Sequence, residues 1–332
     1  MDRVEAETVS YYLKVIQDWL DQYWVEYEPD PDYRIALVSL LHAVWPKAGK
    51  EEKPSYFPLP ILCGQAAGKI NQTTVAANTA WVLLFVASYL LDKIEDEEIY
   101  HPIFSKYSPG VVTNLTTGLI LHSGRILTKV EPGDVSKETC EEITREFFRQ
   151  SLMVCAGQHD DLAKKEPDFE QVWRVIDSKS GKFFALGAYL GARLAGADSV
   201  KVASLSEVGR RLGILNQMNN DLSGLGIGEE TGSDLASGRR TLPAQYALLV
   251  LPPEKRAKLV EYLHTAVSDP TSEVEARRMI VSAGAVIYLS LEAAKYRQQA
   301  ISLLDSLQLP PQSSMPLYNL INHAGTRISP GI

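Results

Sequence analysis

The sequence predicts an all-α protein that folds as a single helical bundle. Apolar residues recur at three- and four-residue steps along most of the chain, the spacing that lines one face of a helix. Short stretches rich in proline or polar residues separate these segments. No run alternates apolar and polar residues as a strand would, and no linker or internal repeat divides residues 1–332, so one domain is expected.

The same periodicity predicts each helix in turn. The first helix carries Tyr12, Ile16, Trp19, Leu20 and Tyr23 on one face. The later helices are expected, in chain order, at Arg34–Trp45, Thr73–Leu91, Val111–Thr128, Ser136–Val154, Phe169–Leu194, Ala203–Asn220, Leu242–Leu251, Glu254–Val267 and Ser272–Leu307. Proline and polar residues interrupt the pattern at Glu51–Pro60, Glu131–Asp134, Lys165–Pro167, Pro252–Pro253 and Pro310–Pro311.

Composition favours a soluble cytoplasmic protein. The 33 basic and 41 acidic side chains give a net charge of −8, which argues against a nucleic-acid partner. Three cysteines without a C-x-x-C pair favour neither disulfides nor a thiolate zinc site. The N-terminus shows no signal-peptide pattern. The most apolar stretch, Trp81–Leu91, has 11 residues, short of the roughly 20 that span a bilayer, so no membrane span is expected.

Two polar clusters follow apolar helices. Asp92 and Asp96 stand one helical turn apart, so both carboxylates can aim at one point. An isolated acidic cluster at a helix end is more often a solvated face. A second cluster, Asn216–Asp221, changes that balance, because burying its amides and carboxylate is costly unless they are hydrogen-bonded or face a cavity. A wet or metal-filled interior therefore fits better than a sealed core.

Two cationic stretches, Lys179–Lys182 and Gly232–Pro243, complete a pattern of motifs. With them the chain resembles the trans-polyprenyl diphosphate synthase family of the class I isoprenoid synthase superfamily, from about Ser55 to Leu248. The matching stretches are Asp92–Asp96 in the first aspartate motif, Gly157–Asp161 in the G-Q-x-x-D stretch, Lys179–Gly181 in the lysine stretch and Gly232–Pro243 in the tail of the second aspartate motif.

The resemblance implies an isoprenoid synthase bundle with a central cavity that acts on an allylic prenyl diphosphate. In that family three magnesium ions, held by carboxylates on facing helices, stabilise the pyrophosphate that leaves a carbocation. The resemblance implies that Asp92 and Asp96 are catalytic magnesium ligands and that Asn220 and Asp221 form a second metal site. It also implies a homodimer, in which the diphosphate is bound by Gln158, Lys179 and Arg239.

Both aspartate motifs depart from the family pattern. Lys93 replaces the second aspartate of the first motif but leaves the outer pair intact. In the second motif Asn220 takes the first aspartate position and Gly224 takes the last. One metal ligand is thereby weakened and another is missing, although asparagine also opens the second metal motif of many class I terpene cyclases.

The binding site for isopentenyl diphosphate departs further. Chain-elongating relatives use a G-K-R-x-R-P motif, and the matching stretch Pro54–Pro58 contains no cation. Arginines that follow the first aspartate motif are replaced by Glu97–Tyr100. Each charge-assisted contact contributes about 1.5–3 kcal/mol, so losing three or more predicts poor isopentenyl diphosphate binding.

Three interpretations follow. The favoured one is a terpene synthase that ionises an allylic diphosphate and then cyclises or rearranges it without a co-substrate. The alternative is a prenyltransferase with a rebuilt acceptor site, for isopentenyl diphosphate or for another nucleophile. A third is a non-catalytic subunit or prenyl-diphosphate-binding partner of an active relative, which the altered second motif would explain.

Overall fold

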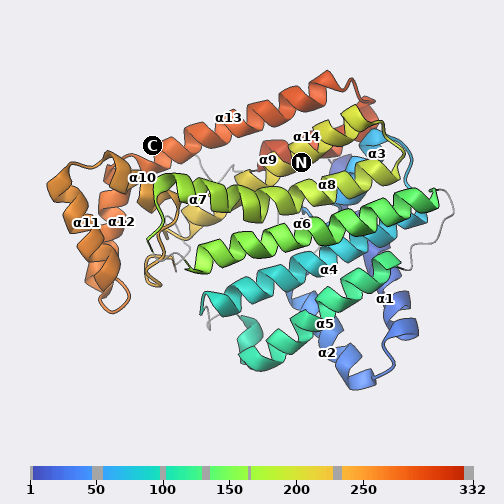
Figure 1. Ribbon diagram of the computed structural model, residues 1–332, viewed down its shortest axis with the longest axis horizontal. Coiled ribbons are helices and arrows are strands. Elements are labelled where there is room, and N and C mark those ends of the chain that lie inside the picture. Colours follow the sequence, from blue (N-terminus) through green and yellow to red (C-terminus); the bar gives the residue numbers. More distant parts are fainter. Residues whose placement is uncertain are drawn as a thin grey trace. The chain divides into compact units, whose positions relative to one another are not determined.

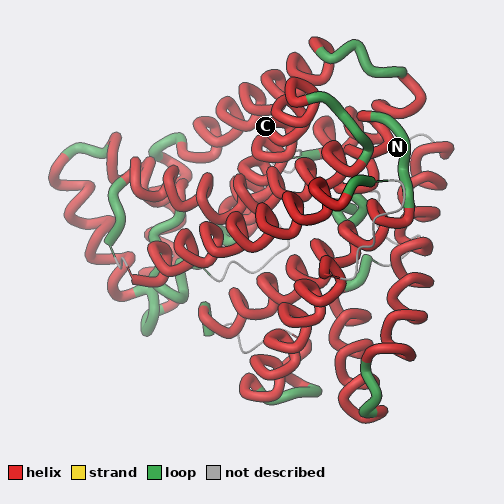
Figure 2. The backbone as a smooth tube through the Cα atoms, turned by 45° about the vertical axis from the view of Figure 1, so that its right-hand side comes forward, coloured by secondary structure: helices red, strands yellow, loops and turns green. Residues whose placement is uncertain are grey.

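The computed structural model describes residues 3–46, 55–97, 102–128, 135–163, 166–226 and 234–324. None of these residues lies in a strand, which confirms the all-α prediction (Figure 1, Figure 2). The elements are α1 (Arg3–Tyr27), α2 (Pro31–Val44), α3 (Leu59–Ala67), α4 (Gln72–Glu95), the 3₁₀ helix η1 (Pro102–Ser105), α5 (Pro109–Thr128), α6 (Lys137–Ala163), α7 (Phe169–Ile176), the π-helix η2 (Asp177–Gly181), α8 (Lys182–Leu194), α9 (Ser199–Ser223), α10 (Leu242–Val250), α11 (Pro253–Thr265), α12 (Pro270–Ser282), α13 (Ala285–Ser306) and α14 (Pro311–His323).

The chain divides into two compact units. Unit 1 comprises Met1–Arg149, Ala185–Gly209 and Leu303–Leu320, and unit 2 comprises Gln150–Phe184, Arg210–Ser302 and Ile321–Ile332. The boundaries fall inside helices such as α6 and α9 rather than at linkers. The expectation of one domain stays a prediction.

Helix α4 is the core helix of unit 1. It packs along α5 and also contacts α1 and α3. Asn71 caps its first turn, since the Asn71 side chain accepts a hydrogen bond from the Thr74 N–H at 2.8 Å. By length and composition α4 is long and apolar enough to cross a membrane, as is the bent pair α12 and α13, but 78% of the apolar window of α4 is buried. The apolar segment is thus longer than the 11 residues expected, and it lies in the protein core.

Helix α3 begins inside a stretch that the sequence predicts as a breaker. Pro60 stands in the first turn of α3, where its missing N–H needs no partner. Asn78 of α4 supports this start, because its side chain accepts from the Ile61 N–H at 3.2 Å and donates to the Phe57 carbonyl at 3.1 Å. Proline therefore starts a helix here rather than ending one, and the same holds for α14, which begins at Pro311.

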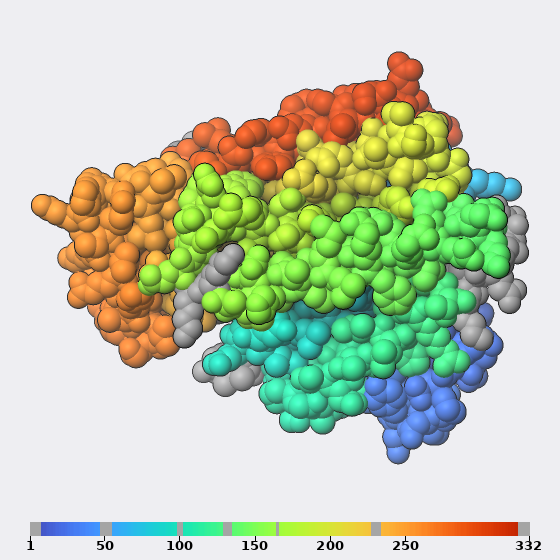
Figure 3. Space-filling model, viewed as in Figure 1, coloured from blue at the N-terminus to red at the C-terminus, as the bar shows by residue number. Residues whose placement is uncertain are grey.

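Two predicted long helices are interrupted. The predicted helix over 272–307 breaks at Gly284, whose φ of +86° lies in the left-handed region that favours glycine. The axes of α12 and α13 meet there at 55°. The predicted helix over 169–194 contains the π-helical turn η2 between α7 and α8. Within unit 2, α12 packs on α10 and α11, and the orange surface of Figure 3 shows the side chains of α11 and α12 together.

Candidate functional site

The π-helical turn η2 is the centre of the candidate site in unit 2. Such turns are rare and occur mostly as single turns, frequently at functional sites. Two neighbouring helices approach η2 so closely that only glycine fits. A Cβ on Gly157 of α6 would lie 2.6 Å from Ser178 Oγ, and one on Gly213 of α9 would lie 2.2 Å from the Ser180 carbonyl oxygen. These two contacts fix η2, and with it Lys179, against α6 and α9.

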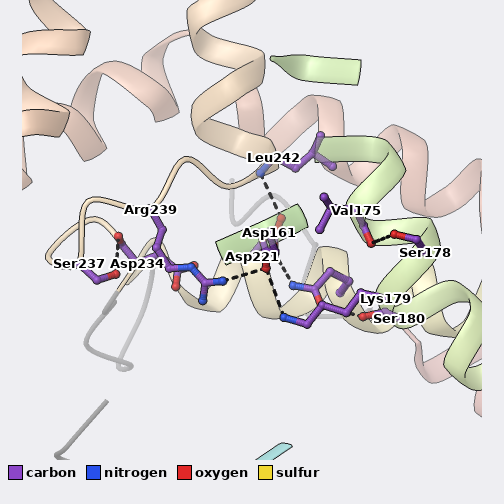
Figure 4. A network of polar contacts seen from close by, with 11 residues as sticks. Asp161, Val175, Ser178, Lys179, Ser180, Asp221, Asp234, Ser237, Arg239 and Leu242 are labelled. Carbon is purple, nitrogen blue, oxygen red and sulfur yellow. Dashed lines mark hydrogen bonds and ion pairs between the residues drawn. The ribbon is translucent and has the colours of Figure 1, made fainter. Parts of the chain in front are cut away.

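Asp161 brings two of the predicted diphosphate-binding cations together. Its Oδ2 accepts from Lys179 Nζ at 3.3 Å and from Arg239 Nη2 at 3.1 Å (Figure 4). The side chains of Lys179, Arg239 and Asp161 are 19%, 27% and 28% exposed. The two cations are therefore held close together and remain within reach of a ligand. Asp161 comes from α6, Lys179 from η2 and Arg239 from the turn before α10.

The turn that carries Arg239 is fixed by its own residues. The Asp234 carbonyl accepts from the Arg239 N–H at 2.9 Å and from Ser237 Oγ at 3.0 Å. Gly238 adopts a φ of +73°, and the side chain of Leu235 is fully buried. These features explain why a leucine and a glycine stand at these two positions of the tail motif: one anchors the turn and the other allows it to close.

Asp221 lies in a buried chain of hydrogen bonds. Its Oδ1 accepts from Gln217 Nε2 at 2.8 Å and its Oδ2 accepts from the Leu242 N–H at the start of α10 at 3.1 Å. Gln217 Oε1 in turn accepts from Ser180 Oγ of η2 at 2.8 Å. Burial raises the pKa of Asp221 to about 6, although the bonds from Gln217 and Leu242 oppose that rise. Asp221 thus ties α9 to the first turn of α10.

The two other predicted residues of unit 2, Gln158 and Asn220, lie close in the chain to Asp161 and Asp221. Gln158 is half-buried on α6, three residues before Asp161. Asn220 is exposed on α9, whereas the adjacent Asp221 is buried. The Oδ1 atom of Asn219 is buried with no hydrogen-bond partner among the described residues. The polar end of α9 is thus partly satisfied by hydrogen bonds, as the sequence requires for amides in an apolar helix.

The first aspartate motif lies in unit 1, at the end of α4. Asp92 and Asp96 are one turn apart, with the Asp96 N–H donating to the Asp92 carbonyl at 2.9 Å, and both side chains are partly exposed. Lys93 Nζ lies 5.5 Å from the centre of the Tyr89 ring, a cation–π distance.

The donor atoms of the predicted metal ligands fit magnesium, which prefers carboxylate and amide oxygens. Asp92 and Asp96 present carboxylates on one helix turn and Asn220 presents an exposed amide. Within the described ranges, no three His, Cys, Asp or Glu side chains lie close enough together to hold a metal ion. The four expected ligands come from both units, and their joint role stays a prediction.

The segment that matches the family's isopentenyl diphosphate motif carries no charged residue in its described part, Ser55–Pro58. Phe57 is buried, and the centre of its ring lies 5.2 Å from that of the Trp45 ring and 5.4 Å from that of the Phe85 ring. Burial raises the pKa of Tyr56 to about 12. Pro54 and residues 98–100 lie outside the described residues. An aromatic cluster of unit 1 therefore stands where the family pattern requires cations.

Sequence reasoning left three residues of this site out of its binding set. Asp161, Gln217 and Ser180 each join groups from separate helices. The fifth position of the G-Q-x-x-D stretch was a signal for Asp161, since a partly buried carboxylate is stabilised by a cationic partner. No sequence pattern showed the Ser180 to Gln217 contact, which depends on the close approach of α9 to η2.

Comparison with known proteins defines the class of this chain. The polyprenyl synthetase family model matches residues 61–280, more than half of the chain. The chain belongs to the polyprenyl synthetase family, a family of enzymes of the class I isoprenoid type, which confirms the predicted family and the prediction of an enzyme.

The relatives are distant in sequence, but their alignments cover more than two thirds of both chains. The chain is 26% identical over 283 residues to the geranylgeranyl diphosphate synthase of Methanosarcina mazei, covering 81% of this chain and 83% of that protein. It is 24% identical over 232 residues to the tryptophan prenyltransferase ComQ of Bacillus spizizenii, covering 68% and 78%. The first name is that of a prenyl diphosphate synthase and the second that of a prenyltransferase, whereas the favoured interpretation was cyclisation. The relatives therefore support the alternative interpretation better.

Solved structures share the fold. The geranylgeranyl pyrophosphate synthetase of Pyrococcus horikoshii aligns with a TM-score of 0.80 at 20% identity, covering 97% of this chain and 99% of that one. The polyprenyl synthase of Caulobacter crescentus, complexed with calcium and isoprenyl diphosphate, aligns with a TM-score of 0.80 at 19% identity, covering 98% of each chain. The predicted isoprenoid synthase fold is confirmed.

Proposed function

We propose that this protein is a prenyltransferase that takes its prenyl group from an allylic diphosphate. The observation that carries the proposal is the pairing of Lys179 and Arg239 on Asp161, in a chain of the polyprenyl synthetase family. Two fixed cations match a diphosphate, which carries several negative charges on adjacent oxygens. Asp161 positions both cations before the donor arrives, which lowers the entropic cost of binding.

Each residue has a defined task in this proposal. Lys179 and Arg239 neutralise the diphosphate oxygens, and Gln158 donates from its amide. Asp92, Asp96, Asn220 and Asp221 are the residues that would hold magnesium, which when bound supplies positive charge that stabilises the leaving pyrophosphate. Asp221 also keeps the start of α10 in place through the Leu242 N–H.

The acceptor is proposed to be a nucleophile without a diphosphate. The described part of the matching segment is an aromatic cluster built on Phe57, and a diphosphate bound there would lose its charged partners. An apolar or aromatic acceptor fits such surroundings. Tryptophan, the acceptor named for the relative ComQ, has this chemistry.

Cyclisation without any acceptor is the second candidate. The same aromatic segment favours it, because a cyclase needs no second diphosphate site and has to keep water from quenching the carbocation. The two candidates differ in one respect that an assay measures: prenyl transfer needs an acceptor and cyclisation does not.

The test is pyrophosphate release by the purified full-length protein with Mg²⁺. Geranyl, farnesyl and geranylgeranyl diphosphate are each supplied alone, with isopentenyl diphosphate, and with a tryptophan-containing peptide. Release that depends on the peptide, with a prenylated product in the mass spectrum, is the expected result. Release with the donor alone and a cyclic product would establish cyclisation instead. Release only with isopentenyl diphosphate would overturn the proposed acceptor, and absence of release in all arms would overturn prenyl transfer.

The first aspartate motif gives a sharper test of the magnesium ligands. Asp92→Ala and Asp96→Ala are each expected to lower the rate of pyrophosphate release at least about a hundredfold. Both carboxylates are proposed to hold magnesium, whose positive charge would stabilise the leaving pyrophosphate. The control Glu95→Ala removes an exposed carboxylate from the same helix and should retain the rate. Equal rates in all three variants would refute the metal role of Asp92 and Asp96.

A further inference from the structure

Three ionisable side chains of unit 2 that have no place in the proposed binding set meet beside it: Arg240, Glu166 and His264. Arg240 Nη2 donates to Glu166 Oε1 at 2.6 Å, and His264 Nε2 lies 3.0 Å from both atoms. Arg240 follows Arg239 in the turn before α10, Glu166 precedes α7, and His264 lies on α11. The cluster therefore joins three segments that are distant in the chain, and one of them carries a proposed diphosphate-binding cation.

The Arg240 side chain is enclosed, whereas its two partners face solvent. It is 9% exposed, while the side chains of Glu166 and His264 are 58% and 59% exposed. An enclosed guanidinium costs free energy unless a carboxylate compensates its charge. The hydrogen bond with His264 and the charge of Arg240 lower the pKa of Glu166, so Glu166 stays ionised opposite the guanidinium at neutral pH. Arg240 is thus held in the protein by Glu166.

The residues on either side of Arg239 both pack on the C-terminal end of α11. A Cβ on Gly238 would lie 3.1 Å from Cγ2 of Val267, two residues beyond α11, and Arg240 contacts α11 itself. Arg239, between them, points instead to Asp161 of α6 (Figure 4). Since both neighbours are held against α11, the backbone at Arg239 is fixed, and with it the direction in which the Arg239 side chain leaves the turn.

We propose that Arg240 is a positioning residue for prenyl transfer: paired with Glu166, it holds the turn so that Arg239 meets the diphosphate. The inference rests on the proposed function, since it assigns a task at the same diphosphate site. Arg240 does not contact the diphosphate, because its guanidinium binds Glu166. The two successive arginines of the tail motif therefore have different tasks. Arg239 binds the ligand, and Arg240 attaches the turn to the rest of unit 2.

Glu166→Gln tests the pair without changing either arginine. Calorimetry on the full-length protein with Mg²⁺ measures the affinity for inorganic pyrophosphate, which should fall about threefold to thirtyfold. If Arg240 bound the diphosphate directly, removing the competing carboxylate would leave the affinity equal or raise it. That result would overturn the inference. Glu261→Gln removes an exposed carboxylate from α11; it is the matched control and should bind like the wild type.

A double-mutant cycle shows whether the effect passes through Arg239. In an Arg239→Met background, Glu166→Gln should lower the affinity no further, because the side chain that the pair positions is gone. An equal loss in both backgrounds would point to general damage to unit 2 and would overturn the positioning role. The thermal midpoint of Glu166→Gln, measured without ligand, should match that of Glu261→Gln, so that the loss of affinity is not a loss of folded protein.

The outcomes separate this inference from the function on which it rests. If the wild-type protein does not bind pyrophosphate, both the proposed function and the role of Arg240 are overturned. If the wild type binds pyrophosphate and Arg239→Met weakens the binding, but Glu166→Gln binds like the wild type, the diphosphate site stands and only the positioning role fails.

Discussion

Lys179 shows how a single residue acquires its role from the residues around it. It lies in a helical turn whose backbone is fixed by glycine contacts, and its Nζ is 3.3 Å from the Asp161 carboxylate. A lysine held in this way has little freedom to lose when an anion binds. Its exposure of 19% leaves room for a ligand.

Lys179→Met is expected to weaken binding of inorganic pyrophosphate about tenfold to a hundredfold, because a charge-assisted hydrogen bond contributes about 1.5–3 kcal/mol. Arg239→Met should have a similar effect. Isothermal titration calorimetry in the presence of Mg²⁺ measures both. Lys182→Met, three residues further on in the chain, is the control and should bind like the wild type. Equal weakening in all three variants would point to general loss of positive charge rather than to a site.

His122 of unit 1 provides a second prediction from a single residue. Its Nδ1 is 2.9 Å from the Tyr23 hydroxyl and its Nε2 is 3.3 Å from Glu28 Oε2. Burial lowers the pKa of His122, and Arg125 lowers it further, while Glu28 opposes the change. At pH values between that lowered pKa and about 6.5, the ordinary pKa of histidine, His122 binds a proton in the unfolded chain but not in the folded one. This group's contribution to stability is therefore complete above about pH 6.5 and declines as the pH falls.

The thermal midpoint of the wild type should accordingly drop between pH 7.5 and pH 5.5, and His122→Gln should show a smaller drop. Differential scanning calorimetry across that range measures the effect. His42→Gln, which removes an exposed histidine of the same unit, should show the full drop of the wild type. A steeper drop in His122→Gln than in the wild type would contradict the neutral state assigned to His122.

Among the elements, η2 is defined by the helices that surround it. Gly213→Ala would place a Cβ 2.2 Å from the Ser180 carbonyl oxygen, so α9 and η2 have to separate. The expected cost is about 1–3 kcal/mol, which lowers the thermal midpoint by about 2–8 °C, together with weaker pyrophosphate binding. Gly110→Ala on α5 is the matched control, because a Cβ there has no atom within 4 Å. A midpoint for Gly213→Ala equal to that of Gly110→Ala would disprove the close approach.

The sequence predicts elements well where one helix determines its own pattern, and poorly where several elements act together. Helical periodicity found α4 and α9, because burial of one face is encoded locally. The turn η2 interrupts a continuous periodic segment, and its cause lies in Gly157 and Gly213, which are distant in the chain. Helices α3 and α14 were missed because proline was interpreted only as a terminator, although it also favours the first helical turn.

The same distinction applies to the candidate site. Its cationic residues Lys179 and Arg239 were predicted, because charged motifs are visible in the sequence. Their common partner Asp161 was not predicted, because it precedes Lys179 by 18 positions in the chain and Arg239 by 78. The hydrogen bond from the Leu242 N–H to Asp221 was also not predicted, since it depends on where α10 begins.

At the scale of the whole molecule, the family resemblance predicts a homodimer, and unit 1 has a surface suited to one. Leu121 on α5 is 69% exposed, and Ile120 beside it and Phe148 on α6 are also exposed apolar residues. Gly124 of α5 lies against the Phe148 ring, where a Cβ would come within 2.9 Å. α5 and α6 thus each carry exposed apolar side chains close to a point where the two helices touch, and exposed apolar side chains that gather on a surface are typical of protein interfaces.

Leu121→Asp is expected to convert a dimer into a monomer, because a charge in an apolar interface loses its hydration. Light scattering after gel filtration should give about twice 36.7 kDa for the wild type and 36.7 kDa for the variant. Leu291→Asp changes a residue of unit 2 that is 67% exposed and should leave the mass unchanged. A wild-type mass of one chain would refute the dimer.

The placement of the tryptophans in the two units has an optical consequence. Of the five tryptophans in the chain, Trp19, Trp24, Trp45 and Trp81 belong to unit 1, and Trp173 belongs to unit 2, where its ring stacks on Tyr296 at 5.8 Å. Intrinsic fluorescence of the wild type is thus weighted toward unit 1. The tryptophan fluorescence of a protein that retains only Trp173 comes from unit 2, and that of a protein that lacks only Trp173 comes from unit 1. Comparing the two proteins therefore reports separately on the unfolding of each unit, without any attached dye.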